Sequence, residues 1–423
     1  MKCRYFCDSE AHALGRRSFM QAFGAGLAVG GWGLASQSQA LAQLKSEQKR
    51  MLVVFLAGGV SQLETWDPKP KTDTGGPFRA IPTSVPGIHI SELLPQTAKN
   101  FDKLSLIRSI NSHNDDHGKG SYQMGYGRNQ MPGVAYPHLG SVCAKALERQ
   151  NSPLPGFLRI PGGGRGNDAA YLGPAYNSVG VNGNPLANSA RHGSLSDQID
   201  QKRHDFRRGL NDRFLASRRT AETEVYTESF EQALGLMERR DVFDVSKESA
   251  EDQARYGSHD FGKHCLMARR LLEQDVPFVQ VSHSNYDTHN ENFNFHLEQM
   301  AEFDTPFSNL ITDLDDRGMM ESTLVVVMSE FGRTPRINAR YGRDHWGKSW
   351  SICLGGAGIQ PGAVIGKTNE NGTEVIDREV APGDLFHTYL SAVGIDSSGT
   401  FDIDGRELPV ADPAHGPISE LIT

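Results

Sequence analysis

The chain has 423 residues, of which 38% are hydrophobic and 22% charged, and its formal net charge is −8 at pH 7. This composition is that of a globular protein with a sizeable core, and it lacks the excess of basic residues by which nucleic-acid-binding domains hold phosphates. The 45 glycines and 21 prolines predict many loops, the segments in which functional sites usually lie.

Residues 1–42 have the pattern of an export signal. Arg16-Arg17 precedes a mildly apolar run, Ala22–Ala35, which the small residues Ala40–Ala42 follow. The run is shorter than the roughly 20 apolar residues that span a bilayer, so we expect no stable membrane anchor. The pattern predicts a twin-arginine (Tat) signal peptide, export by the Tat machinery, and a periplasmic or secreted protein whose single domain comprises residues 43–423.

Unbroken apolar runs predict strands that are buried on both faces of a mostly parallel sheet. In chain order these runs are Met51–Ala57, Leu104–Ile110, Phe278–Val281 and Leu324–Met328. Helical periodicity precedes and follows the third run, and a further helix is predicted at Pro382–Val393. The alternation of helix and strand is typical of right-handed parallel crossovers, so the sequence predicts an α/β fold.

Two segments in the middle of the chain are predicted to lie outside the sheet. Residues 151–193 are rich in Gly, Pro and Asn, which favours a long surface excursion. Residues 196–255 are charged and helix-forming, with Phe206, Leu210 and Phe214 at four-residue spacing. We interpret this second segment as a helical insertion with a solvated charged face.

Polar side chains follow every predicted strand at its carboxyl end, where open α/β sheets bind their ligands. Asp287 and His289 come after the third strand, and Glu330 and then His345 come after the fourth. In extended backbone, residues two apart share a face, so Asp287 and His289 can hold one ion together. Although a single loop histidine is more often an ordinary surface residue, this mixed carboxylate and imidazole set predicts a divalent metal, with zinc first and manganese or iron as alternatives.

One pattern near this site is interpreted as accidental. Gly342–Ser349 matches G-x-x-x-x-G-K-S, the phosphate-binding loop of nucleotide hydrolases. That loop needs an apolar strand directly before it and a helix directly after it. Here a polar segment precedes the match and a predicted strand, Trp350–Leu354, follows it.

Four motifs resemble the family called domain of unknown function 1501: Leu56–Pro70, Tyr286–His289, Glu330–Pro335 and Gly342–Trp346. The resemblance covers essentially the whole chain after the signal. That family is similar to the alkaline phosphatase and sulfatase superfamily. The resemblance implies a three-layer αβα sandwich with a mixed, mostly parallel sheet and a metal site at the strand ends.

The resemblance also implies roles for individual residues. Asp287, His289 and His345 match the positions that hold one metal in the superfamily, and Glu330 matches a ligand of the other, so one or two ions are expected. Phe331 stands where the superfamily commonly has a histidine. The remaining candidate ligands are Glu64, Asp67 and Asp344.

The nucleophile stays open at this point. The resemblance places the nucleophile position at His117, which is favoured as a ligand or an acid/base group. Ser121 or Ser61 could supply a hydroxyl, or a metal-bound water could attack directly. No cysteine precedes the x-Pro-x-Arg pattern that formylglycine formation requires.

Two functions follow from these features. The first is an exported metal-dependent hydrolase of a phosphate or sulfate ester, either a small anionic ester or a sulfated or phosphorylated glycan. In it, Arg333 and Arg343 would hold the substrate anion. The alternative is a non-catalytic secreted protein on the same fold that keeps a metal and binds a polysaccharide or another exported protein.

Overall fold

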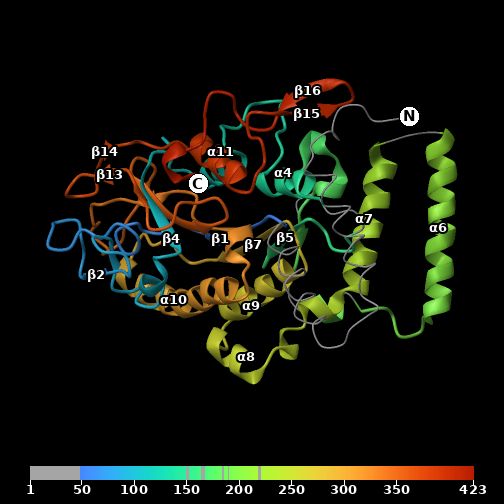
Figure 1. Cartoon of the computed structure of the whole chain (residues 1–423), viewed down its shortest axis with the longest axis horizontal. Helices are drawn as coiled ribbons and strands as arrows, with labels where there is room; N and C mark the ends of the chain where they lie inside the picture. Colours follow the sequence, from blue (N-terminus) through green and yellow to red (C-terminus); the bar gives the residue numbers. More distant parts are fainter. Residues whose placement is uncertain (1–47, 149–151, 163–166, 183–184, 189, 218–220) are drawn as a thin grey trace, which may run out of the picture. The chain divides into compact units, whose positions relative to one another are not determined.

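The central element is an eight-stranded sheet with the strand order β12-β4-β11-β8-β1-β7-β5-β6 (Figure 1). Its strands are β1 (Arg50–Leu56), β4 (Leu104–Ile110), β5 (Phe157–Ile160), β6 (Val179–Gly180), β7 (Phe278–His283), β8 (Thr323–Met328), β11 (Trp350–Gly356) and β12 (Val364–Ile365). β1 pairs in parallel with β7 and β8, whereas β11 is antiparallel to β4 and β8. The predicted mixed, mostly parallel sheet is therefore confirmed.

This computed structural model describes residues 48–148, 152–162, 167–182, 185–188, 190–217 and 221–423. The predicted signal peptide, residues 1–42, lies outside the described residues. Gln48–Thr423 form one unit. Among the described helices, none combines the length and the apolar character needed to cross a bilayer.

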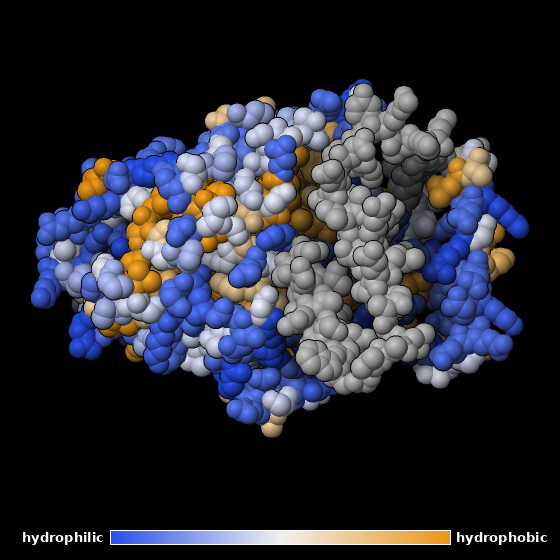
Figure 2. Space-filling view, in the orientation of Figure 1, coloured by the Kyte–Doolittle hydropathy of each residue, from blue (hydrophilic) through white to orange (hydrophobic). Residues whose placement is uncertain are grey.

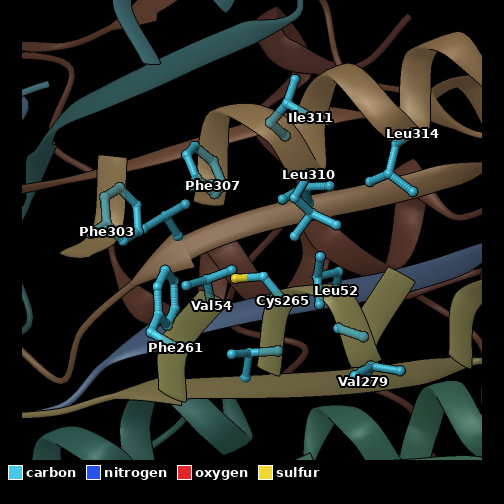
Figure 3. Close-up of a cluster of buried hydrophobic side chains, with 14 of the residues drawn as sticks. Leu52, Val54, Phe261, Cys265, Val279, Phe303, Phe307, Leu310, Ile311 and Leu314 are labelled. Atoms are coloured by element: carbon cyan, nitrogen blue, oxygen red, sulfur yellow. The ribbon is translucent and has the colours of Figure 1, made fainter. Parts of the chain in front are cut away.

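Helices cover both faces of the sheet, because alternate residues of each strand point to opposite sides. Leu52 and Val54 of β1 pack against α9 and α10 in one core (Figure 3), and Met51 and Val53 belong to a second core with α4 and α11. These helices are α4 (Leu139–Ala146), α9 (Asp260–Glu273), α10 (Asn292–Asp316) and α11 (Pro382–Ala392). The three-layer arrangement that the resemblance implies is confirmed, with the pairs α9/α10 and α4/α11 on opposite sides of the sheet (Figure 1).

The smaller elements lie around this frame. They are β2 (Ala80–Pro82) with β3 (His89–Ser91), β9 (Gly332–Arg333) with β10 (His345–Trp346), β13 (Lys367–Thr368) with β14 (Val375–Asp377), β15 (Thr400–Ile403) with β16 (Arg406–Pro409), and the short helix α5 (Pro185–Asn188).

Helix α3 (His117–Tyr126) was not predicted, because glycine lowers helix propensity and this segment contains three. The structure shows why two of the glycines are there. A Cβ on Gly120 would lie 2.6 Å from the carbonyl oxygen of Glu330, and one on Gly125 would lie 2.8 Å from the ring of His138. The glycines let α3 approach its neighbours closely, which places His117 at the edge of the sheet.

The prediction that residues 151–193 form a surface excursion is wrong for two short parts of the segment. β5 pairs in parallel with β7, and β6 pairs with β5. Phe157 and Leu158 are fully buried. A strand of four residues between glycine- and proline-rich stretches is too short to show a clear period.

The predicted helical segment 196–255 contains α6 (Asp197–Ser217), α7 (Ala221–Glu238) and α8 (Ala250–Tyr256). Its apolar stripe does not pack into the core, since Phe206, Leu210 and Phe214 are 69%, 48% and 44% exposed. In Figure 2 the surface over α6 is mainly hydrophilic with apolar side chains exposed among the charges. Polar contacts join α6 to α7 instead, including ion pairs from Arg207 and Arg208 to Glu231 at 2.5 and 2.7 Å.

Acid is therefore expected to separate α6 from α7 before the sheet unfolds. The hydrogen bond from Arg208 is the main cause that lowers the pKa of Glu231 to about 2. A carboxyl with a depressed folded pKa stabilises the fold above its unfolded pKa of about 4.3, and this contribution is lost as the pH falls towards 2. Hydrogen exchange of the α6 amides between pH 5 and pH 2 measures this opening, and the variant Glu231→Gln should show it already at pH 5.

Candidate metal centre

The candidate site is built from the segments that follow strands β4, β7 and β8. After β7, Asn285 adopts a left-handed backbone conformation (φ 76°) and turns the chain towards Asp287 and His289. After β8 the chain runs through Glu330 into β9, and the antiparallel pairing of β9 with β10 sets His345 opposite Arg333. Segments far apart in the sequence thus meet at one edge of the sheet.

Three side chains, His117, Asp287 and His345, converge on one point, and His289 lies beside two of them; we name the four the His–Asp cluster. One ligand atom from each of His117, Asp287 and His345 lies within 4.8 Å of the other two. Nε2 of His289 lies 3.0 Å from Nε2 of His345 and 3.1 Å from Oδ1 of Asp287. Nε2 of His345 is also 3.1 Å from Oδ1 of Asp287, and Nε2 of His117 is 3.3 Å from its Oδ2.

An oxygen behind each imidazole fixes the orientation of the ring. The three contacts are His117 Nδ1 to Glu330 Oε1 at 2.7 Å, His289 Nδ1 to Asp344 Oδ1 at 2.7 Å, and His345 Nδ1 to the carbonyl oxygen of Asp115 at 2.8 Å. Carboxylate and carbonyl oxygens accept hydrogen bonds, so these contacts suit a proton on each Nδ1 and direct each Nε2 towards Asp287. A carboxylate or carbonyl oxygen behind Nδ1, with Nε2 directed to a shared point, is the arrangement found where imidazoles bind a metal.

The spacing of these atoms fits a small divalent ion. Ligands at about 2.0–2.1 Å from a tetrahedral ion are separated from each other by roughly 3.3 Å. The contacts of Asp287 with the three imidazoles are 3.1 to 3.3 Å long. Nε2 of His117 is also buried and has no hydrogen-bond partner among the described residues, so an ion would satisfy it. The residues present therefore fit a metal with nitrogen and oxygen ligands.

Arg333 keeps Asp287 ionised. Burial raises the pKa of Asp287, but the hydrogen bond and charge of Arg333 outweigh burial and bring the pKa to about 2. Nη2 of Arg333 lies 2.5 Å from Oδ1 of Asp287, while its Nε and Nη1 donate to the carbonyl oxygens of Gly59 and Arg343 at 2.8 and 3.0 Å. The buried guanidinium is thus held in place and orients the carboxylate.

Glu330 and Asp344, both predicted as metal ligands, lie behind the imidazoles. The buried carboxylate of Glu330 accepts hydrogen bonds from Gly58 N and Ser329 Oγ, both at 2.9 Å, in addition to the one from His117. Asp344 accepts from His289 and from Nδ2 of Asn338 at 3.3 Å. Their oxygens face the Nδ1 atoms, so the geometry favours an orienting role for both.

The substitution Asp344→Asn separates these two roles. Residues that orient a ligating histidine typically contribute about 10- to 100-fold to metal affinity. We expect Asp344→Asn to weaken metal binding by about 10-fold and to leave unfolding unchanged, because this side chain is 54% exposed. Competition with a chromophoric chelator measures the affinity. Complete loss of the metal would instead identify Asp344 as a direct ligand.

Three other predicted site residues are engaged elsewhere. Glu64 and Arg343 are fully buried and pair with each other at 2.8 Å, and Arg343 also donates to the carbonyl oxygens of Thr334 and Thr74. Asp67 contacts Lys69 at 3.0 Å and Thr368 at 2.5 Å. Within the described residues, these contacts do not join them to the His–Asp cluster. Their placement therefore supports neither the ligand roles predicted for the two acids nor the anion-holding role predicted for Arg343.

The remaining predicted residues lie in or near the cluster. His117 joins it, and Ser121 follows one helical turn later in α3 and is half-buried. The sequence did not point to the carbonyl oxygen of Asp115, since a backbone contact leaves no signal in residue types. It also did not show that the ring of Phe331 packs 4.8 Å from that of His117 and 4.6 Å from that of His345.

The pattern Gly342–Ser349 has no phosphate-binding context in the structure. β10 lies within it, and strand β11 begins directly after it, at the place where a nucleotide-binding loop needs a helix. The interpretation of this match as accidental agrees with these elements.

Comparison with solved structures finds distant likenesses to sulfatases and to alkaline phosphatase superfamily members. The PsFucS1 sulfatase from Pseudoalteromonas sp. is 12% identical with a TM-score of 0.40, over 85% of this chain and 70% of that one. The lipoteichoic acid synthase LtaP from Listeria monocytogenes is 9% identical with a TM-score of 0.40, over 83% and 73%. The C-terminal periplasmic domain of EcEptC from Escherichia coli, in complex with Zn, is 10% identical with a TM-score of 0.38, over 82% and 83%.

Comparison with protein families gives a match over most of the chain. A search of curated proteins found no match. The family model described as "Protein of unknown function (DUF1501)" matches residues 48–422, in agreement with the resemblance carried by the four motifs. The chain therefore belongs to the DUF1501 family.

Proposed function

We propose that this protein is an exported metal-dependent hydrolase that acts on a phosphate or sulfate ester. The observation that carries the proposal is the approach of three imidazole Nε2 atoms to the carboxylate of Asp287, at 3.1 to 3.3 Å. The side chains of this cluster are 23% to 48% exposed. Closed coordination is typical of structural metal sites, whereas catalytic sites keep a position open for substrate, so this exposure favours a catalytic site.

The ion we propose is zinc, with manganese or iron as alternatives, and when bound it would act as a Lewis acid towards an oxygen of the ester. Neighbouring side chains orient the residues that would bind the ion. Glu330 and Asp344 contact Nδ1 of His117 and His289 and so direct their Nε2 atoms to Asp287, which Arg333 orients. Since Nε2 of His117 faces Asp287, we assign this residue as a ligand in preference to a nucleophile.

We also propose that the protein is exported and functions outside the cytoplasm. Its support is the twin-arginine pattern of residues 1–42. The twin-arginine route carries folded proteins, and this centre needs the fold, because its ligands come from segments up to 228 positions apart in the chain. Folding and metal uptake in the cytoplasm would therefore precede export.

A second candidate is a secreted protein that keeps the metal without turnover. The observation that favours it is Phe331, whose buried ring packs against the imidazoles of His117 and His345. An apolar ring there offers no ligand for a second ion and no proton to a substrate. A single ion would then serve binding of a polysaccharide or of another exported protein.

One experiment separates the two candidates. The exported protein is purified, its metal content is measured by elemental analysis, and it is assayed with phosphate and sulfate mono- and diesters. Metal together with turnover that Asp287→Ala abolishes supports the hydrolase. Metal without turnover on any ester supports the binding protein, and absence of metal contradicts both.

A further inference from the structure

A cavity of about 380 Å³ lies beside helix α3, outside the His–Asp cluster. Its walls come from the loop after β4, from α3 and the loop that follows it, from the first residues of α11, and from the segment near the C-terminus. Hydrogen bonds join two of these walls, since Gln123 donates to the carbonyl oxygen of Ser112 at 3.1 Å and accepts from Asn114 at 3.3 Å. These hydrogen bonds hold the two walls in a fixed position relative to each other.

Two cationic side chains, Lys119 and Arg128, line this cavity, and the carboxylate of Asp116 lies near the first of them. Within the described residues, neither Lys119 nor Arg128 forms an ion pair, and Nε of Arg128 is buried without a hydrogen-bond acceptor. The guanidinium of Arg128 lies 4.1 Å from the ring centre of Tyr136, a contact with the ring face that leaves its N–H groups unpaired. A buried donor without an acceptor is unfavourable, so a ligand with acceptor oxygens would be stabilised here.

The N-terminus of α11 adds positive potential to the same cavity. Ala381–Gly383 line it, and they begin a helix of 11 residues whose dipole favours an anion; Asp384 accepts from the N–H of Ala381 at 3.0 Å, and Pro382 has no N–H. A Cβ on Gly383 would lie 2.2 Å from the ring of His415, so glycine is needed for this ring to pack against the start of α11. The acid in the lining, Asp412, accepts a hydrogen bond from the backbone N–H of Ala414 at 3.1 Å. A second acid, Asp384, contacts Nδ1 of His415 at 3.0 Å. Within the described residues neither of these two acids pairs with Lys119 or Arg128, so both cations remain available to an anion.

The cavity and the His–Asp cluster lie on either side of the start of α3. Lys119 follows the cluster residue His117 by two positions, which on a helix turns it to another face. Asn114, in the cavity wall, precedes Asp115, whose carbonyl oxygen holds His345. A group bound in the cavity would therefore be close to a group bound at the cluster.

We propose that this cavity binds an oxyanion, namely a sulfate, phosphate or carboxylate group, and that it holds the second anionic group of the substrate whose ester lies at the His–Asp cluster. The link to that ester rests on the proposed function, whereas oxyanion binding itself does not. The substrate class that results is a molecule with at least two negative groups, such as a multiply sulfated or phosphorylated glycan.

Titration calorimetry of the full chain with inorganic sulfate tests the binding. Arg128→Gln should weaken sulfate binding by about 10-fold or more, because it removes a charge-assisted hydrogen bond, and Arg128→Lys should retain part of it. Arg79→Gln, at an arginine whose side chain is 84% exposed, is the matched control and should bind as the wild type does. Wild-type affinity in Arg128→Gln, with its circular dichroism spectrum unchanged, would overturn the proposal.

Asp287→Asn separates failure of this proposal from failure of the proposed function. Sulfate should still bind to this variant, because the cavity does not use the His–Asp cluster. If the variant loses all sulfate binding, the oxyanion binds at the cluster and the cavity proposal is wrong. The link to the substrate is tested with two esters, one with and one without a second anionic group. Arg128→Gln should raise KM for the first ester only, and an equal effect on both would contradict the link.

Discussion

Asp287→Asn is expected to abolish stable metal binding, with a loss of affinity above the roughly 100-fold upper limit typical of orienting residues. Asp287 is the residue that all three imidazoles approach, at 3.1 to 3.3 Å. Its carboxylate also supplies the negative charge that faces the three Nε2 atoms, and a neutral amide cannot replace that charge. Elemental analysis after dialysis against a mild chelator measures the result, and any ester hydrolysis should disappear with the metal.

The control for this substitution is an equally conservative change away from the site. Asp316→Asn, at an exposed carboxylate near the end of α10, alters the net charge by the same amount and should keep the full metal content. Circular dichroism of Asp287→Asn tests whether the fold persists, since Arg333 keeps its carbonyl partners Gly59 and Arg343. A folded Asp287→Asn variant with wild-type metal content would show that the metal is bound elsewhere.

Arg343→Met is expected to lower the free energy of unfolding by about 3–5 kcal/mol, the cost of leaving one charge of a buried pair without its partner. Both side chains of the pair Glu64–Arg343 are 0% exposed, and their closest contact is 2.8 Å. With Arg343 gone, the contact from Asn292 Nδ2 at 3.0 Å and the neighbouring ring of His296 remain, but burial lowers the pKa of His296, so the carboxylate of Glu64 loses its main cationic partner. Urea unfolding at pH 7 measures the change.

Two further variants show whether charge is the cause. Arg336→Met replaces an exposed arginine of the same loop and should change stability by less than about 0.5 kcal/mol. The double variant Glu64→Gln/Arg343→Met removes both charges and should recover part of the loss. Equal stability of Arg343→Met and Arg336→Met would contradict the account of a buried pair.

The effect of Arg343→Met should also depend on pH. Burial raises the pKa of Glu64, but the charge of Arg343 outweighs it, so the folded pKa lies below the ordinary value. The ion pair therefore stabilises the protein above the unfolded pKa of about 4.3, and this stabilisation is lost as the pH falls through the folded value. In the variant, acid neutralises the isolated carboxyl, so the difference from wild type should shrink between pH 7 and pH 3.

The sequence predicted the parts of this protein that depend on local pattern. Apolar runs located β1, β4, β7 and β8, and the polar residues that follow β7 and β8 in the chain include Asp287, His289 and His345, which lie close together at one edge of the sheet. This worked because the carboxyl ends of parallel strands lie at the same edge, whatever the connections between them. Helix α3 was missed because the glycines that let it pack closely also weaken its helical signal.

Roles that depend on tertiary contacts could not be predicted from the sequence. Glu330 and Asp344 have the same chemistry as a metal ligand, and only their position behind His117 and His289 shows that they orient these rings. Glu64 pairs with a residue 279 positions away, and no periodicity relates the two. Which of these carboxylates lies behind an imidazole and which is buried against an arginine is decided by the fold.

The most direct test of the metal centre is anomalous X-ray diffraction from crystals of the exported protein, recorded above and below the absorption edge of the metal found by elemental analysis. We expect one peak, about 2.0–2.2 Å from Nε2 of His117, His289 and His345 and from a carboxylate oxygen of Asp287. No peak among these four side chains, or a peak bound by other residues, would contradict the account.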